Sequence, residues 1–131
     1  MDQKFGKSYK LCSRKIMDEL FSTGKSISCY PFRLVYNEYE LPTKKLFQVT
    51  ISVPKRNFKK APDRNRIKRL IRESLRKNKT ELEPFLQAEN KQMALFLIYV
   101  GKEILSYSEV ERKIVLTLER LINDLKKQKE A

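Results

Sequence analysis

The stretch RNRIKRLIR, from Arg64 to Arg72, gathers positive charge in a way that could bind phosphate groups. Five of its nine residues are Arg or Lys, and Asn65 adds an amide. The planar guanidinium of arginine can hold a phosphate through two parallel hydrogen bonds, which a lysine ammonium cannot do. At about 100° per residue, Ile67 and Ile71 share one side of a helix, which we expect to be buried.

The opposite side of this helix would carry a row of polar and cationic residues about 17 Å long. We call this row the basic ridge; it consists of Asn65, Arg69, Arg72 and Arg76, with Arg66 and Lys68 on its flanks. Between residues 64 and 79, eight cations accompany one acid, Glu73, so the i,i+4 acid–base pairs that usually support a charged helix are almost absent. This pattern favours phosphate binding over an ordinary solvated helix face.

The charge of the whole chain is unevenly distributed. Its 131 residues carry 29 Lys and Arg against 16 Asp and Glu, a net charge of +13. Residues 55–79 hold twelve cations and two acids, and they account for +10 of this total. Cations kept only for solubility would be spread more evenly, whereas a polyanion needs them where its backbone passes. The distribution therefore predicts a nucleic-acid partner.

Composition disfavours several other classes of function. The chain has no histidine and its acids are scattered, so no histidine base or carboxylate metal site for protein-only phosphodiester hydrolysis is recognisable. Cys12 and Cys29 lack the partners of a zinc site, and we expect both to be reduced structural cysteines. No segment has the pattern of a signal peptide or a membrane span. We predict a cytoplasmic protein with no membrane partner, no catalytic residue and no bound metal.

Several elements must position the basic helix. Periodicity and end signals predict a helix over 11–24, a short strand before Pro31, strands from Phe32 and over 47–53, the basic helix over 62–77, an apolar strand over 93–100 and a last helix from Ser108. We expect the strands from Phe32 and over 47–53 to pair as an antiparallel hairpin. The patterns Thr80–Glu83 and Ser108–Glu111 predict capping boxes at helix starts.

This order of elements predicts the α+β class, with helices packed on one sheet as a two-layer α/β sandwich. No repeat or low-complexity linker interrupts the chain, so residues 1–131 should form a single nucleic-acid-binding domain. The core should span about 9–125. Both ends, including the tail after Leu125, are expected to fray.

With these elements in place, the residues resemble a known family. RNRIKRLIRE follows SVPKR at a strand end and the segment FKKAPD, and this order is similar to the RNR signature of the bacterial ribonuclease P protein subunit. LFSTGKS, PFRLVY and FQVTISVPKR also stand in the family's order. The resemblance implies an αβββαβα fold like domain two of ribosomal protein S5. It also implies a left-handed βαβ crossover between the strand ending at Val53 and the strand beginning near Met93.

The resemblance also implies a function. Proteins of this family assist a catalytic RNA that hydrolyses a phosphodiester in precursor tRNA, releases the 5′ leader and leaves a 5′-phosphate. The Mg²⁺ is held by the RNA, and the protein broadens the range of substrates. On this interpretation the chain is the non-catalytic subunit of an endoribonuclease, its partners are the catalytic RNA and precursor tRNA, and it binds no DNA.

The family's binding residues can be carried over by position. Contacts to the catalytic RNA then fall on Lys55, Arg56, Arg64, Asn65, Arg66, Lys68, Arg69 and Arg72. Contacts to the precursor tRNA leader fall on Met17, Phe21, Phe32 and Val35, on a concave face between the first helix and the sheet. Aromatic rings suit this role because every base offers a face for stacking. Core packing is an equally good interpretation of Phe21 and Phe32.

The chain departs from the family pattern at two places. Met17 and Val35 stand where the family commonly has aromatic residues. The segment NFKKAPD, 57–63, lacks the usual glycine and has Pro62 in place of a valine, although Lys59 and Lys60 add positive charge there. The geometry of this loop is therefore not given by the resemblance.

Two other functions fit part of the pattern. A structural RNA-binding protein of the ribosomal type, without a role in cleavage, is compatible with the composition, and only the ordered motifs favour the ribonuclease P subunit over it. A DNA-binding regulator would need a dimer seam or a helix-turn-helix partner for the basic helix. The last helix is too short and irregular for a zipper.

Overall fold

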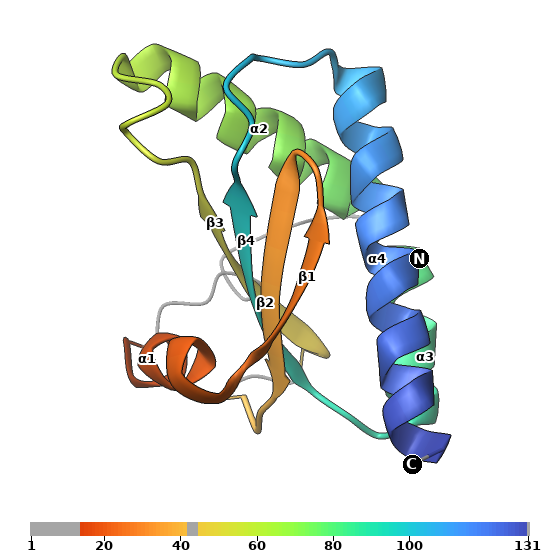
Figure 1. Cartoon of the computed structure of the whole chain (residues 1–131). Coiled ribbons are helices and arrows are strands. Elements are labelled where there is room, and N and C mark those ends of the chain that lie inside the picture. The colour runs from red at the N-terminus through yellow and green to blue at the C-terminus, as the bar shows by residue number, and fades with distance from the viewer. Residues whose placement is uncertain (1–13, 42–44, 131) are drawn as a thin grey trace.

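The computed structural model describes residues 14–41 and 45–130. Its elements are, in order, α1 (Arg14–Thr23), β1 (Lys25–Cys29), β2 (Phe32–Glu38), β3 (Phe47–Ser52), α2 (Ala61–Asn78), the 3₁₀ turn η2 (Lys79–Glu81), α3 (Glu83–Ala88), β4 (Met93–Tyr99) and α4 (Tyr107–Glu130). The predicted αβββαβα order is confirmed, with η2 and α3 inserted between α2 and β4 (Figure 1).

The strands form one sheet in the order β1-β2-β4-β3. β2 pairs antiparallel with both β1 and β4, whereas β3 pairs in parallel with β4, from Phe47 opposite Met93 to Ser52 opposite Ile98. The predicted hairpin between β2 and β3 is therefore wrong: β1 is the hairpin partner of β2, and β3 lies at the far edge. Side-chain alternation sets which face of a strand is buried but does not choose its neighbour.

The connection from β3 to the parallel strand β4 passes through α2 and α3 (Figure 1). This is the βαβ crossover that the resemblance implies, and it places the basic helix directly after an edge strand. The left hand of the crossover stays a prediction.

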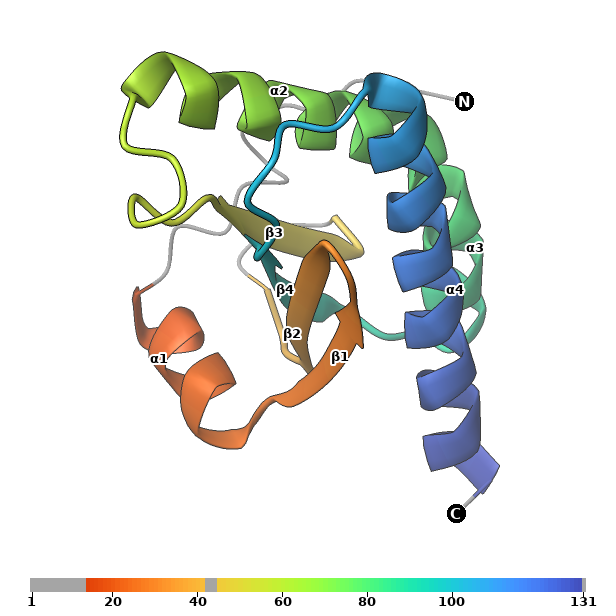
Figure 2. The same ribbon diagram turned by 45° about the horizontal axis from the view of Figure 1, so that its top comes forward.

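Two hydrophobic clusters cover the two faces of the sheet. The larger joins the sheet to α2, α3 and α4, with Ile71, Leu86 and Leu121 fully buried. The smaller lies under α1 and contains Ile16, Leu20, Val35, Leu41 and Ala94. Figure 2 shows α1 apart from α2 and α4, with the sheet between them. The sheet with α2 and α4 makes the predicted sandwich, and α1 covers part of the other face.

Several element ends differ from the prediction. α4 begins at Tyr107, because Ser106 Oγ accepts the Glu109 N–H at 3.3 Å and so takes the capping role expected of Ser108. The Thr80–Glu83 box is not formed either: Leu82 stands at the N-cap of α3, without a side-chain cap. α4 continues to Glu130, through residues expected to fray.

The described residues also bear on the cysteine and membrane predictions. Cys29 is buried and free, as expected of a reduced structural cysteine, whereas Cys12 lies outside the described residues. Within 14–41 and 45–130, every helix is too short or too polar to cross a bilayer.

Candidate nucleic-acid interface

Helix α2 separates an apolar side from a charged side. Ile67, Ile71 and Leu75 are at most 3% exposed and join the main core. On the other side Arg69 and Arg72 are exposed. Proline in the first turn and Asp63 both suit a helix start, and Arg76 and Lys77 suit the last turn. Packing of Ile67, Ile71 and Leu75 against the core therefore turns the basic ridge towards solvent.

Three arginines of the basic ridge are available to an external anion. The side chains of Arg66, Arg69 and Arg72 make no ion pair or hydrogen bond with any residue in the described ranges. Asn65 is exposed beside them. These cations repel one another, and no acid of the described residues offsets the repulsion. Binding of a polyanion would relieve it and so lower the electrostatic free energy of the helix.

Arg76 differs from the other arginines of the ridge. Its guanidinium binds the Glu73 carboxylate through both Nε, at 3.1 Å, and Nη2. The hydrogen bonds from Arg76 lower the pKa of Glu73. The C-terminal end of the basic ridge is therefore an ion pair, Arg76 with Glu73. The positive charge that is not neutralised by an acid lies before it, between residues 65 and 72.

The C-terminal end of α2 is fixed to α4 by polar contacts. Asn78 Nδ2 donates to the Ser74 carbonyl at 2.8 Å and to Glu111 Oε2 at 3.1 Å. The Tyr107 hydroxyl donates to the same Glu111 oxygen at 2.9 Å, and burial together with this hydrogen bond raises the pKa of Tyr107 to about 12. Glu111, expected from the sequence to complete a capping box with Ser108, thus instead accepts hydrogen bonds from Asn78 on α2 and from Tyr107.

The other end of α2 is fixed to the loop that follows β3. Arg64 Nη1 donates to the carbonyls of Phe58, at 2.8 Å, and Lys59, at 3.0 Å. Phe58 is buried, and its ring lies 6.0 Å from that of Tyr99. Lys55 and Arg56 are exposed on the same loop. The loop is therefore anchored, and its cations continue the charge of α2 towards the sheet.

A second exposed surface lies between α1 and the sheet. Phe21 on α1 is 59% exposed, and its ring meets the half-buried Phe96 of β4 edge to face, with 4.8 Å between centroids. Met17 lies beside them and accepts the Thr50 hydroxyl on its sulfur at 3.6 Å. Val35 lies beneath, 6% exposed. We call Met17, Phe21 and Phe96, with Val35 beneath, the α1-side surface.

Gly24 allows α1 to approach the sheet this closely. It ends the helix with its N–H on the Leu20 carbonyl at 2.8 Å. A Cβ at this position would lie 2.4 Å from that carbonyl oxygen and 3.0 Å from Cγ1 of Val35. A larger residue would therefore move α1 away from β2 and change the α1-side surface.

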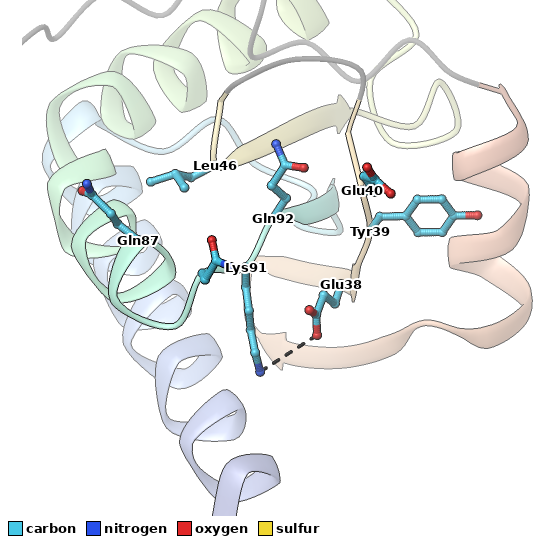
Figure 3. Close-up of a pocket in the computed structure, with 8 residues that line it drawn as sticks. Glu38, Tyr39, Glu40, Leu46, Gln87, Lys91 and Gln92 are labelled. Atoms are coloured by element: carbon cyan, nitrogen blue, oxygen red, sulfur yellow. Dashed lines mark ion pairs between the residues drawn. The ribbon is translucent and has the colours of Figure 1, made fainter.

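A pocket at the end of β2 contains acids, and several of its polar side chains contact other parts of the protein (Figure 3). Lys91 reaches towards Glu38, with 3.9 Å between Nζ and Oε2. The Gln92 side chain accepts the Leu41 N–H and donates to the Lys45 carbonyl, both at 2.9 Å. These contacts join the chain on either side of residues 42–44, and they give the pocket a structural role.

The fold thus carries two candidate surfaces, the basic ridge on α2 and the partly aromatic α1-side surface, and the sequence of this chain matches a known family. The family model of ribonuclease P matches residues 5–122. The chain belongs to this family. The resemblance to this family that the sequence motifs indicated is thereby confirmed. The family implies an RNA-binding role in tRNA processing within a ribonucleoprotein.

Relatives and solved structures agree with this assignment. The chain is 32% identical to the ribonuclease P protein component of Porphyromonas gingivalis, over 91% of this chain and 87% of the relative. It is 33% identical to that of Streptococcus agalactiae, over 86% and 93%. Its fold is similar to the ribonuclease P protein of Thermotoga maritima, with a TM-score of 0.69 at 24% identity, covering 85% of this chain and 96% of that one.

The residues carried over from the ribonuclease P family for the catalytic RNA fall on one continuous region, α2 and its preceding loop. Asn65, Arg66, Arg69 and Arg72 are exposed, Lys68 is partly exposed, and Arg64 is turned towards the loop. The structure thus brings the set together, and within the part of the chain that it describes, Arg64 is the member whose side chain has internal hydrogen-bond partners.

The second set carried over from the ribonuclease P family is split by the sheet. Met17, Phe21 and Val35 share the α1 face, but Phe32 is 1% exposed in the opposite cluster, where its ring lies 5.6 Å from that of Tyr99. The placement of Phe32 with the other three is therefore wrong. Successive strand residues face opposite sides, so Phe32 and Val35, three apart, cannot share a face of β2.

Sequence reasoning missed Phe96, the aromatic residue that contacts Phe21. The run from Met93 to Tyr99 is almost uniformly apolar, so it gave no contrast between two faces. The alternation of side chains along a strand could have revealed it. Leu95 and Leu97 face the main core, so Phe96 between them faces α1.

Proposed function

We propose that this chain is the protein subunit of ribonuclease P and assists the RNA-catalysed removal of the 5′ leader from precursor tRNA. The observation that supports this most is a set of three arginines on α2 in a chain of this family: the side chains of Arg66, Arg69 and Arg72 have no partner among residues 14–41 and 45–130. The protein's contribution is binding: it holds the catalytic RNA and the leader together and so broadens the range of substrates, in the cytoplasm.

The basic ridge binds the catalytic RNA in this proposal. Guanidinium groups spaced along one side of a helix suit phosphates along a folded RNA backbone, since each can form a bidentate contact. Lys55, Arg56 and Lys68 extend this surface on either side of the arginines. Such contacts depend on charge and shape rather than on base identity, as expected for docking on one large structured RNA.

The α1-side surface binds the leader. An exposed ring such as Phe21 can stack on an unpaired base of any identity. Phe96 supports that ring from below, while Met17 and Val35 provide an apolar floor with less stacking area than aromatic residues would give. A single strand on this surface would therefore be held with little sequence preference.

The chemistry of hydrolysis is assigned to the RNA partner. Among residues 14–41 and 45–130, His, Cys, Asp and Glu side chains form no group of three that could hold a metal ion. The Mg²⁺ in this proposal is held by the RNA, and we assign no step of the reaction to a side chain of this protein.

Reconstitution tests the proposal. The purified protein is mixed with its cognate catalytic RNA and a labelled precursor tRNA at a Mg²⁺ concentration just too low for the RNA alone. We expect cleavage by the mixture, with a 5′-phosphate on the mature end, and none by the protein alone. Cleavage by the protein alone would overturn the proposal. Failure to rescue, together with equally tight binding to ribosomal RNA, would support the structural RNA-binding alternative.

A further inference from the structure

The two arginines of the triplet Arg64-Asn65-Arg66 lie on different sides of α2. Two residues along an α-helix correspond to a rotation of about 200°, so side chains at these positions point in nearly opposite directions. Arg66 is exposed with the ridge, whereas Arg64 is only partly exposed and lies on the side of Ile67 and Ile71. The triplet therefore cannot present both guanidinium groups to one RNA surface in the same way.

Arg64 uses its side chain within the protein. Both contacts of Nη1 are to backbone carbonyls of neighbouring loop residues, Phe58 at 2.8 Å and Lys59 at 3.0 Å. A guanidinium nitrogen has two hydrogens, so these bonds use the full donor capacity of Nη1. The helix start needs such help, because Lys60 at the N-cap position makes no side-chain capping bond.

The loop held by Arg64 carries much of the positive charge near the ridge. Its four cations, Lys55, Arg56, Lys59 and Lys60, are all exposed. Two further contacts hold it: the Asn57 N–H donates to the Pro54 carbonyl at 3.2 Å, and the Phe58 side chain is buried. The N–H groups of Asp63 and Arg64 also donate to the Lys60 carbonyl at the end of the loop, and the Arg64 side chain adds the link from α2 to the backbone at Phe58 and Lys59.

We propose that Arg64 is a positioning residue that fixes the 55–60 loop against α2, so that the loop's cations and the basic ridge form one preorganised RNA surface. This inference rests on the proposed function, because the surface matters only if RNA binds there. Arg64 thus differs in role from Arg66, Arg69 and Arg72, which meet the phosphates. A loop already held in its bound conformation loses less entropy when RNA binds.

The first experiment compares Arg64→Lys with Arg112→Lys, which changes an exposed arginine on α4 outside the proposed RNA surface, in the full chain. Both keep the charge, but Arg64→Lys loses the planar fork that reaches two carbonyls. In the free protein we expect the amide order parameters of residues 58–60 to fall from about 0.85 to below about 0.6 in Arg64→Lys only. Affinity for the catalytic RNA should fall about fivefold in Arg64→Lys and less than about twofold in Arg112→Lys. Unchanged order parameters in Arg64→Lys would overturn the inference.

A double-mutant cycle separates positioning from a direct contact. Arg64→Met, the pair Lys59→Ala and Lys60→Ala, and all three changes together are compared for affinity to the catalytic RNA. If Arg64 acts through the loop, Arg64→Met should weaken binding at least about threefold less once the two lysines are gone. Strictly additive losses would mean that Arg64 meets phosphate itself and would refute the positioning role. If the unaltered chain binds no catalytic RNA, the proposed function fails, while the order parameters still decide whether Arg64 holds the loop.

Discussion

The ring of Phe21 stands edge to face against Phe96, 4.8 Å between centroids with the planes at 64°, although the two residues come from α1 and β4. Phe96 is half-buried, whereas Phe21 leaves 59% of its surface to solvent. An exposed ring held in a fixed orientation by a second ring is a preformed stacking platform. This relationship gives the α1-side surface its first test.

We expect Phe21→Ala to weaken binding of precursor tRNA by the reconstituted enzyme about tenfold, because one base–aromatic stack is worth about 1–3 kcal/mol. Affinity for mature tRNA, which lacks a leader, should stay unchanged. Leu116→Ala on α4 removes an exposed apolar side chain elsewhere and serves as the control. Equal losses for precursor and mature tRNA would assign Phe21 to packing.

The basic ridge is tested by salt dependence. Each phosphate contact releases counterions, so Arg69→Ala and Arg72→Ala should each reduce the slope of log affinity against log salt by about one unit. Binding to the catalytic RNA is measured over a range of KCl concentrations. Lys127→Ala, an exposed cation near the end of α4, should leave the slope as it is. An unchanged slope in the arginine variants would indicate an ordinary solvated helix face.

Adjacent residues of α2 should respond in opposite ways. Ile71 is fully buried, and Ile71→Ala should lower the free energy of unfolding by about 2–5 kcal/mol because it leaves a cavity in the main core. Arg72 is exposed, and Arg72→Ala should change this free energy by less than about 0.5 kcal/mol while weakening RNA binding. Urea denaturation measures both. Similar losses of stability would contradict the division of α2 into two sides.

Stability should fall at high pH through Tyr36. Its hydroxyl donates to Asp124 Oδ2 at 3.3 Å, and burial, followed by the charge of Asp124, raises the pKa of Tyr36 from 10.0 to about 12. Because the raised pKa favours the neutral phenol in the folded state, its stabilisation is complete below about pH 10 and is lost as pH rises through about 12.

In Tyr36→Phe the free energy of unfolding should therefore fall less between about pH 10 and pH 12, by up to about 2 kcal/mol. The chain has six tyrosines, so the difference in phenolate absorbance between the wild type and Tyr36→Phe during the same titration reports Tyr36. Tyr30→Phe, which removes an exposed phenol, should keep the wild-type pH dependence. A Tyr36 that titrates near pH 10 in the folded protein would refute the prediction.

Much of the fold could be predicted because local signals were strong. The stripe Ile67, Ile71 and Leu75 fixed the orientation of α2, and the same projection puts Arg64 on the buried side, although the family motif suggested otherwise. For Phe32 and Val35 the strand period already excluded a shared face. In each case the residue's angle around its own element was a better guide than its position in a motif.

Strand neighbours could not be predicted in this way. The sequence offered β2 and β3 as a hairpin, since they are consecutive and separated by a turn-like segment. β3 instead pairs with β4 across α2 and α3, and nothing in residues 47–53 shows which strand will lie beside them. Pairing across such a distance depends on how the helices pack on the finished sheet.

The central place of β4 has a consequence for how the protein is made. β4 is the last strand to leave the ribosome, yet it is the strand that joins β3 to the β1–β2 hairpin. Until residues 93–99 are synthesised, β3 has no partner in the sheet, and α2 has only part of its core. Contacts between distant residues form slowly because long loops must close first. The basic ridge on α2 should therefore reach its final position only after β4 has been synthesised. By then the basic segment has already left the exit tunnel of the ribosome, which is itself a large RNA.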